Sequence, residues 1–174
     1  RNSDFTTAVL IGDKSDFTTE LATKLEADGI FPQVISQSCD EPLDLQLMDT
    51  PLDRRTLVVF LAGLQETAGE PTAADSSWTG LAGCPHVASL LELAQTLHRR
   101  EGVPRLCLVT NGAAGVSGDE SLVLRQSVLH GMARVINNEC PNVPLSVIDL
   151  SEAPSPGEID ELYYELLHSR VDQD

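Results

Sequence analysis

The run Thr56-Leu-Val-Val-Phe-Leu-Ala62 constrains the fold more than any other segment, because no polar side chain follows its first residue. A strand with one solvent-facing side alternates polar and apolar residues, whereas a parallel strand covered on both faces is apolar throughout. The run therefore predicts a central parallel strand, in a fold whose helices cover both faces of the sheet.

The rest of the chain alternates strand-like and helix-like segments. Further strands are expected at 7–13, 32–36, 105–110 and 145–150, and helices at 16–28, 87–100, 120–138 and from 155 onward, with one helical turn near 45–48. This alternation predicts an α/β fold, a truncated Rossmann-like parallel sheet of about five strands flanked by helices. Right-handed crossovers favour the strand order 3-2-1-4-5, and 174 residues suit a single domain, 1–174.

Two helix ends carry recognisable signals. Gly29 stands where a glycine ends a helix. Ser155-Pro156 is typical of a helix start, because proline suits the first helical position and the acidic Glu158 suits the first turn.

Charge and composition exclude some classes of function. The net charge is -16, with 27 acidic against 11 basic residues and no basic stripe, so nucleic-acid binding is not expected. No apolar run approaches the length of a membrane span, and residues 1–5 lack the apolar stretch of a signal peptide. We therefore expect a soluble, cytoplasmic chain with no membrane contact.

The cysteines and histidines indicate neither a metal site nor a catalytic group. Cys39, Cys84, Cys107 and Cys140 form no CxxC pair, and only Cys84 has a histidine close by. We expect free thiols, with Cys107 in the core, and no metal. The four histidines, His86, His98, His130 and His168, are scattered, and structural roles are expected for them.

The turn after the first strand, Gly12-Asp13-Lys14-Ser15-Asp16, is poorly suited to a dinucleotide. A pyrophosphate loop needs several glycines for close backbone approach and a helix N-terminus free of negative charge. Here there is one glycine, and two aspartates stand where phosphate must lie.

A second turn offers weak candidates for cofactor binding. Gly112, Gly115 and Gly118 follow the fourth strand at three-residue spacing, and Asp149 ends the next strand, about where a ribose-binding acid could lie. Only one strand and one helix follow, too little to seat a nicotinamide. A flexible turn with a helix cap is the favoured interpretation.

No complete catalytic site is predicted. A GxSxG elbow is absent, and Tyr163 and Tyr164 are not followed by the lysine of a Tyr-x-x-x-Lys pair. The carboxylates are numerous, but no spacing singles out an acid-base pair. Hence no catalytic residue is assigned.

Residues 105–150 resemble the ketoreductase region of modular polyketide synthases, more narrowly its N-terminal structural subdomain. The similarity lies in Leu108-Val-Thr-Asn-Gly-Ala113, Gly131-Met-Ala-Arg134, Asn138-Glu-Cys-Pro141 and Ile148-Asp-Leu150, in that order. The chain departs from the family pattern at Asn111, where the residue is often basic, and at Cys140, where histidine or phenylalanine is frequent.

The resemblance implies a division of labour between two Rossmann-type halves. The first half has lost cofactor binding and catalysis, and the second holds NADPH and reduces a carrier-bound β-ketoacyl thioester. This chain resembles the first half, whose partners are the catalytic subdomain and neighbouring synthase domains. The helix over 120–138 is the expected contact, with Gly131 permitting close approach and Arg134 and Glu139 fixing orientation. Gly131 could instead be a packing residue inside this domain.

Two other functions stay open. One is an active NADPH-dependent short-chain reductase with its site near Gly112–Gly118. The other is the interaction half of an inactive pseudo-ketoreductase. Because acyl carrier proteins are usually acidic, this acidic chain is expected to leave carrier docking to another domain.

Overall fold

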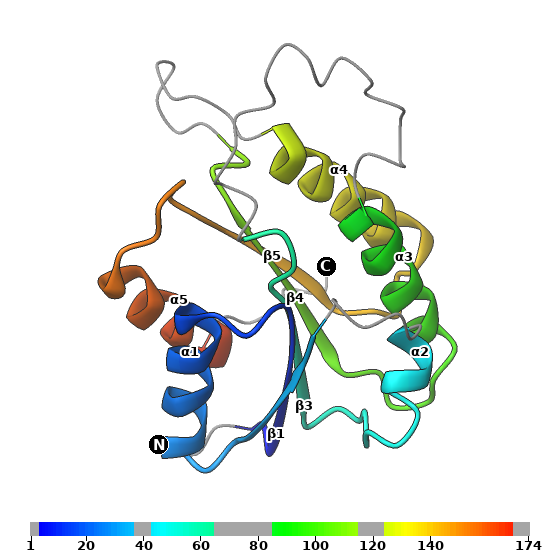
Figure 1. The fold of residues 1–174 in the computed structure, drawn as a ribbon. Helices are drawn as coiled ribbons and strands as arrows, with labels where there is room; N and C mark the ends of the chain where they lie inside the picture. Colours follow the sequence, from blue (N-terminus) through cyan, green and yellow to red (C-terminus); the bar gives the residue numbers. More distant parts are fainter. Residues whose placement is uncertain (1–3, 37–42, 65–84, 115–123, 169–174) are drawn as a thin grey trace.

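The structure is a computed structural model that describes residues 4–36, 43–64, 85–114 and 124–168. Strands and helices alternate along the chain, as the sequence predicts (Figure 1). The elements are β1 (Thr7–Ile11), α1 (Asp16–Ala27), β2 (Phe31–Ile35), α2 (Leu43–Gln46), β3 (Thr56–Phe60), α3 (Pro85–His98), β4 (Arg105–Asn111), α4 (Leu124–Glu139), β5 (Leu145–Leu150) and α5 (Pro156–His168).

The five strands form one parallel sheet in the order β2-β1-β3-β4-β5. The α/β class and the five parallel strands are confirmed, but the predicted order 3-2-1-4-5 is wrong. β3 is buried along its whole length and lies between β1 and β4, whereas β2 is an edge strand with Phe31 72% exposed. Pro32 fits this edge, because proline cannot donate a hydrogen bond to a neighbouring strand.

Helices cover both faces of the sheet (Figure 1). α1 and α5 lie on one face, over a core that includes Leu21, Leu25, Leu162 and Leu166. The short α2 and the longer α3 and α4 lie on the other face, and their core includes residues of all three helices. Successive residues of β3 enter the two cores in turn, as expected of a strand with two buried faces.

The local expectations at Gly29, at Pro156 with Glu158, and for Cys107 in the core are met. Gly29 follows α1 with a φ of +79°, which glycine adopts at low cost. α5 begins at Pro156, and the Glu158 carboxylate accepts the Ser155 backbone N–H at 2.8 Å, which is the glutamate half of a capping box. Cys107 and Cys140 are buried free thiols, while Cys39 and Cys84 lie outside the described residues. Among the described residues, no helix has the length and apolar character needed to cross a membrane.

Candidate functional site

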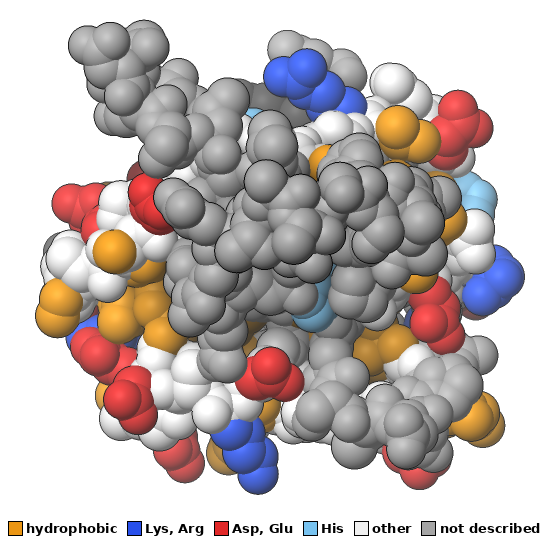
Figure 2. All heavy atoms as spheres, turned by 45° about the horizontal axis from the view of Figure 1, so that its top comes forward, with side chains coloured by type: hydrophobic (Ala, Val, Ile, Leu, Met, Phe, Trp, Pro, Cys, Tyr) orange, Lys and Arg blue, Asp and Glu red, His pale blue; other side chains and the backbone are white. Residues whose placement is uncertain are grey.

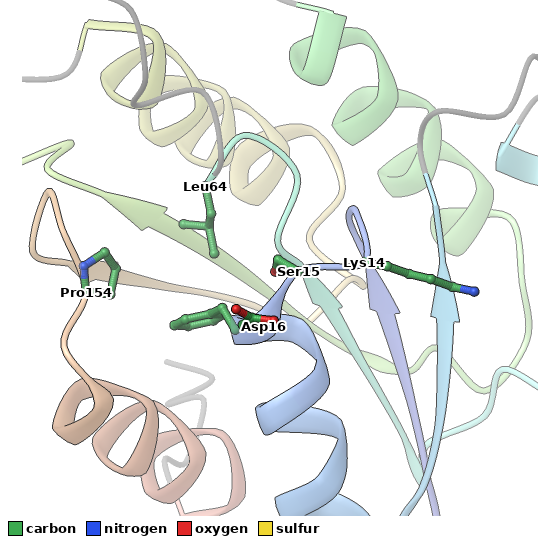
Figure 3. A pocket seen from close by; sticks show the side chains of 6 residues that line it. Lys14, Ser15, Asp16, Leu64 and Pro154 are labelled. Carbon is green, nitrogen blue, oxygen red and sulfur yellow. The ribbon is translucent and has the colours of Figure 1, made fainter.

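A site in such a sheet is sought at the carboxyl ends of the strands, where neighbouring connections diverge. In this strand order the divergence falls between β1 and β3, because one connection leads from β1 to β2 and the other from β3 to β4. A pocket of about 460 Å³ lies there, between the α1 N-terminus, the segment after β3 and the loop after β5 (Figure 3). Its lining residues are Lys14, Ser15, Asp16, Phe17, Leu64 and Pro154.

One polar group at this pocket, the Ser15 hydroxyl, is already used within the chain. Ser15 caps α1, and its Oγ accepts the Thr18 backbone N–H at 3.1 Å. Asp16 supplies an acidic side chain in the first turn of the helix. Figure 3 shows the Lys14 side chain extending away from Leu64 and Pro154, so its ammonium is not directed toward them. Among the described lining residues, an anionic ligand would meet Asp16 without a cation directed toward Leu64 and Pro154.

The glycine-rich turn lies at the end of β4. Gly112 has a φ of +62°, so glycine is required to turn the chain there. Of the weak cofactor candidates, only Gly112 is in the described residues; Gly115 and Gly118 lie outside them.

The Asp149 carboxylate closes this turn from within the chain. Its Oδ1 accepts the Thr110 hydroxyl at 2.7 Å and the Ala113 backbone N–H at 3.0 Å, and its Oδ2 accepts the Ala114 backbone N–H at 2.9 Å. Backbone N–H groups in a glycine-rich turn are the donors that a cofactor phosphate uses. Here the acid considered as a ribose ligand instead occupies two of those donors.

Two buried amide side chains form hydrogen bonds at the carboxyl ends of the strands. Asn111 is fully buried, and its Nδ2 donates to the Glu152 carbonyl at 2.9 Å. Gln126 in α4 is 1% exposed, and its Nε2 donates to the Gly63 carbonyl at 2.6 Å. The sequence analysis did not identify Gln126, because a polar residue in a helix is expected to face solvent. The available signal was Gly63, the glycine that follows the apolar run 56–62.

The candidate interface residues share the outer side of α4. Gly131, Arg134 and Glu139 are all exposed. A Cβ added at Gly131 would meet none of the described atoms outside its own helix turn within 4 Å, which argues against a packing role for Gly131 inside this domain. Arg134 and Glu139 form no ion pair within the described part of the chain. An interface role for the three residues therefore stays a prediction.

None of the described titratable groups with clear pKa shifts lines the pocket. Backbone N–H groups of Ser155 and Ser151 lower the pKa of Glu158 to about 2. Burial raises the pKa of the Cys107 thiol to about 11, which makes it a poor nucleophile. Burial and the hydrogen bond to Asp28 raise the pKa of Tyr163 to about 12.

The histidines whose hydrogen bonds are resolved serve helix ends. His98, the last residue of α3, pairs with the Asn142 side chain, and Asn142 Nδ2 donates to the His98 carbonyl at 3.0 Å. His168 ends α5 and stacks on Tyr164 with ring centroids 4.2 Å apart. In the described ranges, no group of three or more metal-ligating side chains lies close together.

Comparison with solved structures places the fold. A C2-type ketoreductase from a modular polyketide synthase matches with a TM-score of 0.61 and 20% identity, over 92% of this chain and 36% of that one. This chain has a ketoreductase-like fold. A small-chain dehydrogenase also matches, with a TM-score of 0.57 and 16% identity over 95% of this chain and 90% of its own.

The sequence relatives are polyketide synthases. One of the subunits of the phenolphthiocerol/phthiocerol polyketide synthase of Mycobacterium tuberculosis is 27% identical over 82% of this chain, which spans 7% of that protein. Phthioceranic/hydroxyphthioceranic acid synthase of Mycobacterium bovis is 32% identical over 52% of the chain and 4% of its own length. No family model matches the sequence. Sequence and fold therefore both relate this chain to a limited part of such synthases.

Proposed function

We propose that this chain is the noncatalytic structural half of a polyketide-synthase ketoreductase, and that it packs against and stabilises an NADPH-dependent catalytic half. The observation that carries the proposal is the Asp149 carboxylate, which takes the turn N–H groups that a cofactor phosphate would need. The fold match to 36% of a ketoreductase chain supports it, because the remainder of that chain is long enough to hold a second half.

The charge distribution favours the α3 and α4 side for the contact. α1 and α5 together carry seven acidic residues and one lysine, namely Asp16, Glu20, Glu26, Glu158, Asp160, Glu161, Glu165 and Lys24. Figure 2 shows acidic side chains gathered on the α1 and α5 side, with basic, acidic and histidine side chains interspersed on the other. A large acidic face opposes burial and also repels an acidic acyl carrier protein, so carrier docking falls to another domain in a cytoplasmic synthase.

Reconstitution tests the proposal. The chain is mixed with the catalytic half of its parent ketoreductase, and reduction of a β-ketoacyl N-acetylcysteamine thioester is followed by loss of NADPH absorbance. We expect no turnover by the chain alone and restored turnover by the mixture. NADPH binding and turnover by the chain alone would favour an active reductase. A stable complex without turnover would favour an inactive pseudo-ketoreductase.

A further inference from the structure

The turn after β4 presents three hydrogen-bond donors that converge on one anion. The Thr110 hydroxyl and the Ala113 backbone N–H donate to one oxygen of the Asp149 carboxylate, at 2.7 and 3.0 Å. The Ala114 backbone N–H donates to the other oxygen at 2.9 Å. Successive backbone N–H groups in a turn can form a concave site for an anion. The spacing of these donors fits the two oxygens of a single carboxylate.

The shape of this turn is also held by groups other than the Asp149 side chain. The Gly112 backbone N–H donates to the Leu150 carbonyl at 2.9 Å, which ties the turn to the end of β5. From the other side, the Ser127 hydroxyl of α4 donates to the Ala113 carbonyl at 2.8 Å. Neither bond involves the carboxylate, so the donors are expected to stay in place when the carboxylate is removed.

The site is open to solvent and carries no full positive charge of its own. Ala114 is exposed and Asp149 is half-buried, so a small ion can reach the donors from outside. Lys24 forms the ion pairs found in the described part of the chain, and its partners are Glu20 and Asp160. The Asp149 carboxylate is therefore held by neutral N–H and O–H groups.

Asp149 has two advantages over an external anion in the unchanged chain. Its carboxylate is carried by β5, which pairs with β4 in fixed register, so it reaches the donors without losing the translational freedom that a free ion loses. An external anion must also approach a chain of net charge -16. The unchanged chain is therefore expected to keep external anions out of this turn.

We propose that the turn after β4 is a carboxylate-binding site that the chain fills with its own Asp149, and that removal of this side chain opens the site to a small external carboxylate. This goes beyond the proposed function, because it states what the donors bind and not only that a cofactor phosphate is denied them. The ligand class follows from the geometry, in which one oxygen accepts two donors and the other accepts one.

Formate tests the proposal in Asp149→Ala, which lacks one carboxylate group and leaves space for one formate ion. Thermal unfolding is followed by circular dichroism in sodium formate and in sodium chloride at equal ionic strength, up to the molar range. At ten times its Kd, formate is expected to raise the midpoint of the variant by about 4 °C beyond its effect on the unchanged chain. An equal effect of formate on both chains would overturn the proposal.

The same variant stays informative if it does not fold in chloride. Formate is then expected to restore the helical signal, because an ion that binds only the folded state favours folding. An Asp149→Ala chain that remains unfolded in molar formate would contradict the proposal. Formamide, which has a similar size and no charge, is expected to have no such effect. Equal stabilisation by formamide would show that the site is filled by shape and does not select a carboxylate.

A second substitution and NMR locate the bound ion. In ¹⁵N-labelled Asp149→Ala, formate is expected to shift the amide signals of Ala113 and Ala114 most. Adding Thr110→Val removes one donor and is expected to weaken formate binding about fivefold. Adding Thr23→Val removes a hydroxyl that bonds within α1 and is expected to leave the affinity unchanged. Equal losses in the two double variants, or shifts centred elsewhere, would refute a site in this turn.

The formate result and the reconstitution result are independent. Reconstitution uses the unchanged chain, in which Asp149 fills the turn. Restored ketoreductase turnover together with a failed formate test would leave the proposed function standing and remove only the carboxylate site.

Discussion

At the scale of single residues, Asp149 decides what the glycine-rich turn can bind. One carboxylate accepts three donors, two of them backbone N–H groups of Ala113 and Ala114. The sequence showed an acid ending the fifth strand. It could not show that the carboxylate reaches the neighbouring turn, because that contact depends on the register of β4 with β5.

Asp149→Asn tests how much these three hydrogen bonds contribute to stability. The amide keeps one acceptor oxygen and loses the charge, so at least one donor loses its partner. We expect the unfolding free energy in urea to fall by about 1–3 kcal/mol. Asp160→Asn is the matched control, because Asp160 pairs with Lys24 at the exposed surface, where an ion pair adds little to stability. Equal losses of unfolding free energy in the two variants would show that the hydrogen bonds of Asp149 contribute no more than an exposed ion pair.

Glu158 makes part of the stability depend on pH. Its folded pKa of about 2 lies below the ordinary value of 4.5, so its contribution is present above pH 4.5 and lost as pH falls toward 2. Glu158→Gln is expected to lower stability by about 1 kcal/mol at pH 7 and by progressively less at pH 4 and pH 3. Urea unfolding at each pH provides the measurement, with Glu161→Gln on the same helix as control. If the loss of unfolding free energy caused by Glu158→Gln stayed constant with pH, the ionised Glu158 carboxylate would not be what stabilises the helix start.

A substitution at Gly131 is expected to change the stability of the isolated chain and its binding to the catalytic half in opposite directions. Its outward position leaves room for a methyl group, so Gly131→Ala is expected to stabilise the isolated chain by about 0.5–1 kcal/mol, as alanine does in a helix interior. The same methyl group should weaken binding of the catalytic half if a helix approaches there. Gly157→Ala in α5 is the control. Unchanged binding would remove Gly131 from the interface.

At the scale of elements, the sequence predicted the class and the helices but not the order of the strands. The apolar run at 56–62 indicated a central strand, and β3 is central. The order 3-2-1-4-5 contradicted that indication, because it puts the third strand at an edge. Pro32 in the second strand was the neglected signal, since proline in a strand favours an edge position.

The end of β3 is held against α4 more closely than sequence spacing can reveal. Gly63 has a φ of +97°, and an added Cβ would lie 3.0 Å from Gln126 Nε2. Gly29 has a similar backbone angle and open space around it. Gly29→Ala is therefore expected to cost about 1 kcal/mol from backbone strain alone, and Gly63→Ala distinctly more. Equal midpoints in thermal unfolding of the two variants would disprove the close contact.

At the scale of the whole molecule, the two helical layers differ in charge, and the difference matters for assembly. The α1 and α5 layer is acidic, whereas the exposed side of α4 combines Gly131, Arg134 and Val135. Composition predicted only the net charge, because the distribution over two faces depends on the fold. The face with little net charge is the one that a second half can cover at low electrostatic cost.

Thermal unfolding of the catalytic half, alone and with excess chain, tests the proposed role most directly. A partner that binds only the folded state stabilises it by about 2.7 kcal/mol at a hundred times Kd. We expect the unfolding midpoint of the catalytic half to rise with chain concentration, and to rise less with Gly131→Ala. A midpoint that does not change with added chain would contradict a stabilising structural half.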